Sequence, residues 1–185
     1  MASPLENPTG TDTTDIILIN DELPNKDDTR VVVIAIDQSD YSRHVVDWAI
    51  ANFLRRESDL AVLINVCEIS SELSLFAASY MNFSDVLTDF DDQNKLESHK
   101  LLHEFAAKLK AEKFACKAIA MQGDARDEIV RKVSELKADA LILGCHGLGA
   151  IKRMLLGSMS DHCAHYCHCT VIIVKEHNES HNKNA

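Results

Sequence analysis

Five short runs of apolar residues alternate along the chain with stretches in which apolar residues recur every three or four positions. Most of the runs are rich in valine and isoleucine, and continuous β-branched sequence of this length is typical of strands buried on both faces. The first run, Arg30 to Asp37, ends in a polar turn, Asp37-Gln38-Ser39-Asp40. We expect strands at residues 30–37, 60–67, 114–121, 138–143 and 170–174.

Helical spacing of apolar residues fills most of the sequence between these runs. It predicts helices over residues 40–54, 101–112, 124–136 and 158–167. Asp124 is expected to cap the third helix. Ser39 is expected either to cap the first helix or to face a ligand. The last helix begins with Ser158-Met159-Ser160-Asp161, which resembles a capping box. Residues 69–95 have no clean period and are interpreted as a variable insertion of helix and loop.

Strands that alternate with helices predict βαβ units, and therefore a parallel sheet with helices on both faces. In such sheets ligands bind beyond the carboxyl ends of the strands, at the point where the strand order changes direction. Asp37, Val66 and Gly144 all lie at predicted strand ends. The pattern therefore favours a binding site at this edge.

Glycine is concentrated at one of these strand ends. Four of the six glycines, Gly144, Gly147, Gly149 and Gly157, fall within fourteen residues, directly after an apolar run and directly before Ser158. Glycine lets backbone N–H groups approach an anion, and the amino terminus of the following helix would add its free N–H groups and positive dipole end. A tight turn would need only one glycine, so we favour a nucleotide-phosphate cradle.

The charge of the chain is unevenly distributed. Residues 1–29 carry seven acidic residues and one basic residue, hence −6 of a net charge of −10, together with all three prolines. We expect a disordered acidic tail here, with Ile16–Ile19 as a segment able to dock, a single domain over 30–175, and a second tail over 176–185. The acidic balance disfavours nucleic acid and anionic membranes, and without a basic–apolar leader or a membrane-length apolar run a cytoplasmic protein is expected.

The glycine spacing, Gly144-x-x-Gly147, nine residues, then Gly157-Ser158, resembles the signature of the ATP-binding universal stress proteins. VVVIAIDQSDYS and LAVLINV are similar to the first two strands of that family, and the segment from ADALILG to CTVIIV is similar to its last three elements. The resemblance covers roughly residues 30–175. One departure is His168-Cys169-Thr170, which stands where prolines are common in the family.

This resemblance implies a Rossmann-like, adenine nucleotide alpha hydrolase-like fold with five parallel strands in the order 3-2-1-4-5. It also implies a bound ATP, with or without Mg²⁺, and a homodimer that pairs through the last strand, Val171, Ile172, Ile173 and Val174. Asp37 and the backbone of Val66 would hold the nucleoside, and Ala35 is included among the nucleotide-binding residues. Leu143 and Gly144 would line the sugar-phosphate side. The residues that would face the phosphates are Gly147, Gly157, Ser158 and Met159. Apart from the resemblance, Lys152 and Arg153 lie between the glycines, where they are either solvated loop charges or the source of a cation that neutralises a phosphate, and Arg153 is included in the site.

Other functions were weighed against a regulatory nucleotide-binding protein. The chain lacks Gly-x-x-x-x-Gly-Lys-Ser/Thr, the kinase signatures and a nucleophile–base–orienter set, so an ATPase or ATP-using enzyme would be slow, and no catalytic residue is assigned. A flavin or electron-transfer domain of similar architecture is a further alternative. The cluster of cysteines and histidines over residues 161–169 could hold zinc or act as a redox sensor, but paired Cys-x-x-Cys knuckles are missing and packing of reduced thiols is favoured.

Overall fold

The computed structural model describes residues 15–18, 29–67, 83–145 and 156–175. Its strands are β1 (Asp15–Leu18), β2 (Arg30–Ala35), β3 (Asp59–Cys67), β4 (Ala115–Gln122), β5 (Ala140–Gly144) and β6 (Thr170–Val174). Its helices are α1 (Asp40–Asn52), α3 (Phe83–Ala111), α4 (Ala125–Glu135) and α5 (Ser158–Tyr166).

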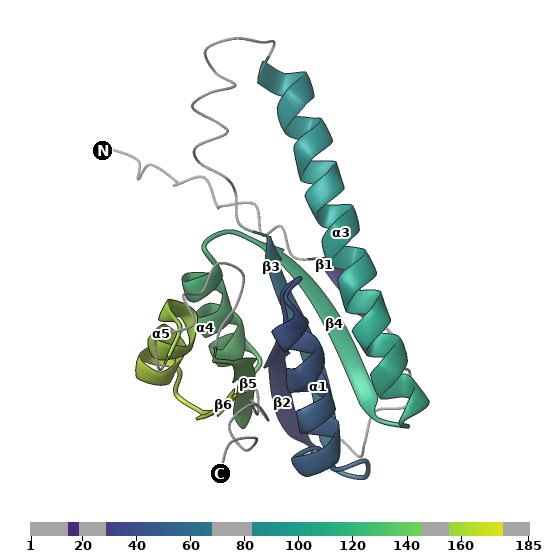
Figure 1. The fold of residues 1–185 in the computed structure, drawn as a ribbon, viewed down its shortest axis with the longest axis vertical. Coiled ribbons are helices and arrows are strands. Elements are labelled where there is room, and N and C mark those ends of the chain that lie inside the picture. The colour runs from purple at the N-terminus through teal and green to yellow at the C-terminus, as the bar shows by residue number, and fades with distance from the viewer. Residues whose placement is uncertain (1–14, 19–28, 68–82, 146–155, 176–185) are drawn as a thin grey trace, which may run out of the picture.

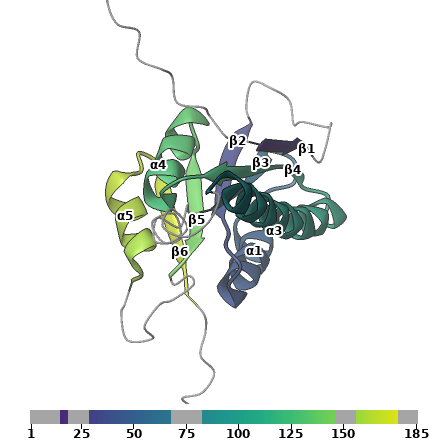
Figure 2. The same cartoon turned by 90° about the horizontal axis from the view of Figure 1, so that it is seen from above.

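The sheet has the strand order β1-β4-β3-β2-β5-β6. Strands β2 to β6 are parallel to one another. Counted from β2 as the first strand, their order is 3-2-1-4-5, which confirms the predicted five-stranded sheet. Helices α1 and α3 cover one face and α4 and α5 the other, as the two views show (Figures 1 and 2). Strand β2 lies between β3 and β5. From β2 the chain adds β3 and β4 on one side and then returns to add β5 and β6 on the other, so the strand order changes direction at β2.

The expectation of disorder over residues 1–29 is wrong for Asp15–Leu18. These four residues form β1, which pairs antiparallel with the outer edge of β4, from Asp15 opposite Ala120 to Leu18 opposite Lys117. An unpaired strand edge presents a row of main-chain donors and acceptors, and a short β-branched segment can satisfy them. The rest of this expected tail, and residues 176–185, lie outside the described residues.

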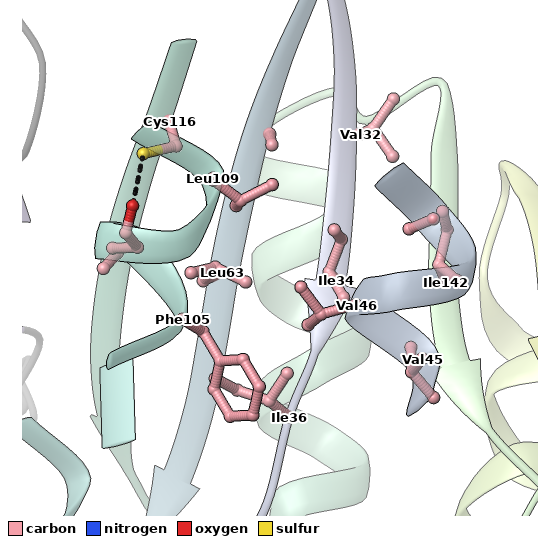
Figure 3. Close-up of a cluster of buried hydrophobic side chains, with 14 of the residues drawn as sticks. Val32, Ile34, Ile36, Val45, Val46, Leu63, Phe105, Leu109, Cys116 and Ile142 are labelled. Atoms are coloured by element: carbon pink, nitrogen blue, oxygen red, sulfur yellow. Dashed lines mark hydrogen bonds between the residues drawn. The ribbon is translucent and has the colours of Figure 1, made fainter. Parts of the chain in front are cut away.

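The core consists of two clusters, one on each face of the sheet. Alternate residues of β2 divide between them: Val32 and Ile34 face α1 and α3, whereas Val33 faces α4 and α5. Figure 3 shows the first cluster, in which Phe105 and Leu109 of α3 meet side chains of the sheet and of α1. Burial of both faces accounts for the continuous apolar runs in the sequence.

The helix that leads to β4 is longer than the sequence predicts. It begins at Phe83, so much of the expected insertion over 69–95 is continuous with the predicted helix that ends near residue 112. Its first turns extend beyond the sheet (Figure 1). Among the described helices, none combines the length and the hydropathy that a membrane crossing needs.

Two of the predicted helix caps differ from expectation. Asp124 does cap α4, because its carboxylate accepts from the N–H of Arg126 and Asp127. Ser39 occupies the N-cap position of α1 without a side-chain cap bond, and the N-cap of α5 is Gly157, so Ser158 is its first helical residue and the expected capping box does not form.

A partly buried ion pair, Arg30–Asp59, joins β2 to β3 at the amino-terminal edge of the sheet. Arg30 donates from Nε to Asp59 Oδ1 at 3.0 Å and from Nη2 to Oδ2 at 2.5 Å, and the Asp59 carboxylate also accepts from the Arg55 N–H and the Ser58 hydroxyl. Burial alone would raise the pKa of Asp59, but these hydrogen bonds outweigh it and hold the pKa below its ordinary value of 3.8. This pair lies at the opposite edge from the predicted binding site.

Candidate functional site

Three strand ends meet at the carboxyl edge of the sheet, where the strand order changes direction. The register places Ile34 beside both Leu63 of β3 and Ile142 of β5, so the residues that follow β2 have a neighbouring strand end on each side. Asp37 follows β2, Val66 is near the end of β3, and Gly144 is the last residue of β5. The structure thus brings these predicted residues to one edge.

The turn after β2 is built around the Asp37 carboxylate. Its Oδ1 accepts from the Ser39 N–H at 3.0 Å, from the Ser39 hydroxyl, and from the Ser42 hydroxyl at 2.7 Å. The Asp37 N–H in turn donates to Ser42 Oγ at 2.7 Å. Ser42 is buried on α1, so the aspartate is fixed to the first turn of that helix. The Ser39 hydroxyl therefore binds the aspartate and does not cap α1 with its side chain, although Ser39 stands at the N-cap position; a contact between Ser39 and a ligand stays a prediction.

The β2–β3 ladder ends at Ile36, whose N–H donates to Ile64 O at 2.9 Å. The Ile36 carbonyl then accepts from the side-chain amide of Asn65 at 2.8 Å. Asn65 is 7% exposed, so this is a buried polar contact. On the other face, Ala35 is half-buried and packs, like Val66, against the core beneath α4 and α5.

The two ends of the glycine-rich segment are held together. The Cys145 N–H donates to Val174 O at 3.0 Å, and the Gly157 N–H donates to Cys145 O at 2.8 Å. The buried Ser160 hydroxyl donates to Gly144 O at 2.7 Å. The chain therefore leaves β5 and returns to α5 at the same place.

The start of α5 presents main-chain donors at this edge. The first intrahelical bond runs from the Asp161 N–H to Gly157 O at 3.0 Å, and no side chain of the described residues caps the helix. The N–H groups of Ser158, Met159 and Ser160 therefore precede the helical ladder, at the positive end of the helix dipole. The Gly157 N–H donates to Cys145 O and so is not among these donors, and the expectation that Gly157 faces a phosphate stays a prediction.

The remaining predicted site residues divide into two groups. Leu143 is buried in the core, which leaves only its main chain for the role expected of it, and Met159 is half-buried against the same cluster. Gly147 and Arg153, with their neighbours in the glycine-rich segment, lie outside the described residues and stay predictions.

Sequence reasoning missed three buried polar residues at this edge. Ser42, Asn65 and Ser160 are half of the six buried polar or charged residues in the described chain, and each bonds a main-chain group at a strand end. Asn65 carried a signal, because it interrupts an otherwise apolar strand. The two serines carried none, since a serine on a helix is usually exposed.

The cysteines near the chain's end pack into the core. Cys163 is fully buried on the side of α5 that packs against the sheet, and Cys167 and Cys169 pack against the same cluster. Burial, with the neighbouring thiols, raises the pKa of Cys163 to about 12, and burial also raises the pKa of Cys167 and Cys169. No group of three His, Cys, Asp or Glu side chains in the described residues is arranged to hold a metal ion.

Comparison with known proteins points to a single family. The chain is 25% identical over 148 residues to the universal stress protein Sll1388 of Synechocystis, covering 78% of this chain and 96% of that protein. It is 30% identical over 162 residues to the Arabidopsis thaliana universal stress protein PHOS32, covering 79% of this chain but only 64% of that longer protein.

Solved structures share the fold. The structure of protein MJ0577 matches with a TM-score of 0.70 at 20% identity, covering 82% of this chain and 99% of the other. An Arabidopsis thaliana universal stress protein family structure with AMP bound matches at 0.60 and 21% identity, covering 80% and 93%. A universal stress protein in complex with cAMP matches at 0.57 and 25% identity, covering 80% and 97%.

The model of the universal stress protein family matches residues 29–175. This span contains five of the six strands and all four described helices, so it includes every element that builds the carboxyl-edge site. The chain belongs to the universal stress protein family.

Proposed function

We propose that the carboxyl edge of the sheet binds an adenine nucleotide, with ATP as the expected ligand. The observation that carries this proposal is the uncapped start of α5, whose three N–H groups lie at the end of β5, the strand that pairs with β2. Helix amino termini bind phosphate because main-chain N–H groups and the dipole act together. Neutral main-chain donors also suit a chain whose net charge is −10, because they bind phosphate without a basic surface.

The nucleoside would lie on the other side of the switch point. In this proposal ribose hydroxyls donate to the Asp37 carboxylate, whose two oxygens together offer about four acceptor sites. The main chain of Val66 would pair with the adenine edge. The AMP-bound and cAMP-bound relatives support an adenine nucleotide of some kind as the ligand class.

A direct test is to identify and titrate the ligand. Mass spectrometry of small molecules that co-purify with the full chain should find an adenine nucleotide. Calorimetry with ATP, ADP, AMP, cAMP and GTP, each with and without Mg²⁺, should show saturable binding of at least one adenine nucleotide and weaker binding of GTP. Gly147→Val should abolish that binding while the circular dichroism spectrum stays unchanged; equal affinity in the variant would contradict the proposal.

We also propose that two copies of the chain pair through β6. This strand ends the described sheet, and its half-buried residues Val171, Ile172 and Ile173 line that edge. The Thr170 N–H donates to Asp139 O, and Val174 O accepts from the Cys145 N–H. The main-chain N–H and carbonyl groups of the even-numbered residues of β6 therefore face β5. Main-chain groups alternate along a strand, so those of Val171 and Ile173 face outward.

This alternation gives a sharp test of the dimer. Val171→Pro removes one outward N–H and leaves the bonds to β5 intact, as edge prolines do. Sedimentation should show a dimer for the wild type and for Val171→Ala, which keeps the N–H, and a monomer for Val171→Pro. A monomeric wild type, or a dimeric proline variant, would contradict this interface.

We infer a regulatory rather than a catalytic role for the bound nucleotide. A ligand shifts an equilibrium by the difference in its affinity for two states, and the dimer is the candidate for such a shift. Saturating ATP should change the dimer dissociation constant measurably, and phosphate release should stay at the rate of a slow ATPase or below it. An unchanged dissociation constant would refute the coupling.

A further inference from the structure

At the end of the β2–β3 ladder a side-chain donor takes the place of a main-chain donor. In a parallel ladder, the rung after Ile36 N–H to Ile64 O runs from the Val66 N–H to the Ile36 carbonyl. Here β2 ends at Ala35, and the Ile36 carbonyl accepts instead from Asn65 Nδ2 at 2.8 Å. The side chain of Asn65 thus occupies the acceptor that would have continued the ladder.

The consequence concerns the direction of the Val66 main chain. The Cys67 carbonyl accepts from the Gly123 N–H on the β4 side, at 3.1 Å, so the alternation of a strand turns the main chain of Val66 towards β2. Beyond Ile36 the chain leaves the sheet and bends into the Asp37 turn, which Ser42 fixes. The N–H and carbonyl of Val66 therefore face the space beside that turn.

We propose that Asn65 is a positioning residue for the base of the nucleotide, an inference that rests on the proposed function. By binding the Ile36 carbonyl, Asn65 ends the ladder one rung early and keeps the Val66 N–H for the ligand. A donor and an acceptor on one residue match the Watson–Crick edge of adenine, where a ring nitrogen accepts and the amino group donates. Asn65 acts through Val66 and does not itself touch the base.

Two further features of Asn65 support a specific role. It is the only polar residue between Leu60 and Val66, in a strand whose other residues there are apolar and buried or half-buried, so an apolar residue would be the ordinary choice for packing. Its amide also lies near the Cys67 thiol, with 3.9 Å between Sγ and Oδ1, which orients the amide with its nitrogen towards Ile36. A buried amide needs such partners, because an unsatisfied one is costly.

The test compares the two halves of the ligand. Calorimetry on the full chain measures the affinity for ATP and for inorganic tripolyphosphate, which lacks the base. Asn65→Ala should weaken ATP binding by about tenfold, the value of one main-chain hydrogen bond, and leave tripolyphosphate affinity within about twofold. Ser98→Ala is the matched control: Ser98 is also buried on the α1–α3 side, and among the described residues its hydroxyl has no partner, so both affinities should stay unchanged.

Amide hydrogen exchange gives one readout on the wild-type protein, which does not require a folded variant, and a second readout on Asn65→Ala. In wild-type protein without nucleotide the Val66 N–H should exchange quickly, and ATP should protect it. In Asn65→Ala without nucleotide this amide should become protected, because the freed Ile36 carbonyl can accept from it.

The possible failures can be told apart. If the wild type does not bind ATP, the proposed function fails and this inference with it. If the wild type binds ATP, the inference alone is overturned by any of three results: unchanged ATP affinity in Asn65→Ala, an equal loss of tripolyphosphate affinity, or a Val66 amide already protected in the nucleotide-free wild type.

Discussion

The amides at the start of α5 can be tested one at a time, because proline is well tolerated at the first position of a helix. Ser158 occupies that position, and Gly157 before it has φ −72° and ψ 158°, the extended conformation that a following proline requires. Ser158→Pro therefore removes one N–H from the proposed phosphate site without breaking an intrahelical bond. The Gly157 N–H to Cys145 O bond, which joins the two ends of the glycine-rich segment, is also kept.

The expected size of the effect follows from the chemistry of the bond. A hydrogen bond to a charged group contributes about 1.5–3 kcal/mol, which corresponds to about 10- to 150-fold in affinity. The control is Ser158→Ala, which removes the hydroxyl and keeps the N–H, so the ratio of the two variants isolates the main-chain donor. Fold stability should stay the same or rise slightly in the proline variant, because proline is pre-organised at this position.

Isothermal titration with ATP is the assay, with thermal melting of each variant as the check on folding. We expect Ser158→Pro to bind ATP at least tenfold more weakly than Ser158→Ala, at a melting temperature that is the same or slightly higher. Equal affinities in the two variants would refute the reasoning, because the N–H of Ser158 would then make no contact with the ligand.

The remaining predictions concern stability and thiol reactivity. Asp59→Asn should cost about 3 kcal/mol in urea unfolding, the low end for a buried pair because Arg30 is 26% exposed. Since the pKa of Asp59 is lowered on folding, its contribution to the free energy of unfolding is fully present well above pH 3.8 and is lost as pH falls through and below that value. A wild-type free energy of unfolding that is flat from pH 5 to pH 2 would contradict this. With a pKa of about 12, Cys163 should resist iodoacetamide at pH 8 in native protein and react after unfolding, and rapid native labelling in a peptide map would show the burial to be wrong. Gly123 has φ +146°, a conformation that residues with a side chain rarely adopt, so Gly123→Ala should lower the free energy of unfolding by about 1–2 kcal/mol, as measured by thermal melting.

The parallel sheet could be predicted because its signals are local. Five apolar runs, separated for the most part by helical spacing, fix the class of fold, and both faces are buried as the continuous β-branched sequence implies. The pairing of Asp15–Leu18 with β4 could not be predicted, because its partner lies about one hundred residues further along the chain. An apolar segment shows that it can pair, but not with which edge.

The candidate site was predictable in its strand ends and not in its supports. Asp37, Val66 and Gly144 follow from where the apolar runs stop. By contrast, whether Gly157 or Ser158 caps α5 depends on backbone angles, because a serine is acceptable at either position. The contact from Asn65 to the Ile36 carbonyl likewise depends on where the β2–β3 ladder ends, which the apolar pattern leaves undetermined.

The central claim, that an adenine nucleotide lies across the carboxyl edge of the sheet, is tested most directly by NMR. Backbone amide signals of the full chain would be followed during an ATP titration. We predict that the largest shifts occur at Asp37, Val66 and the first three residues of α5, Ser158 to Ser160. Shifts confined to the opposite edge, around the Arg30–Asp59 pair, or none at saturating ATP, would contradict the account.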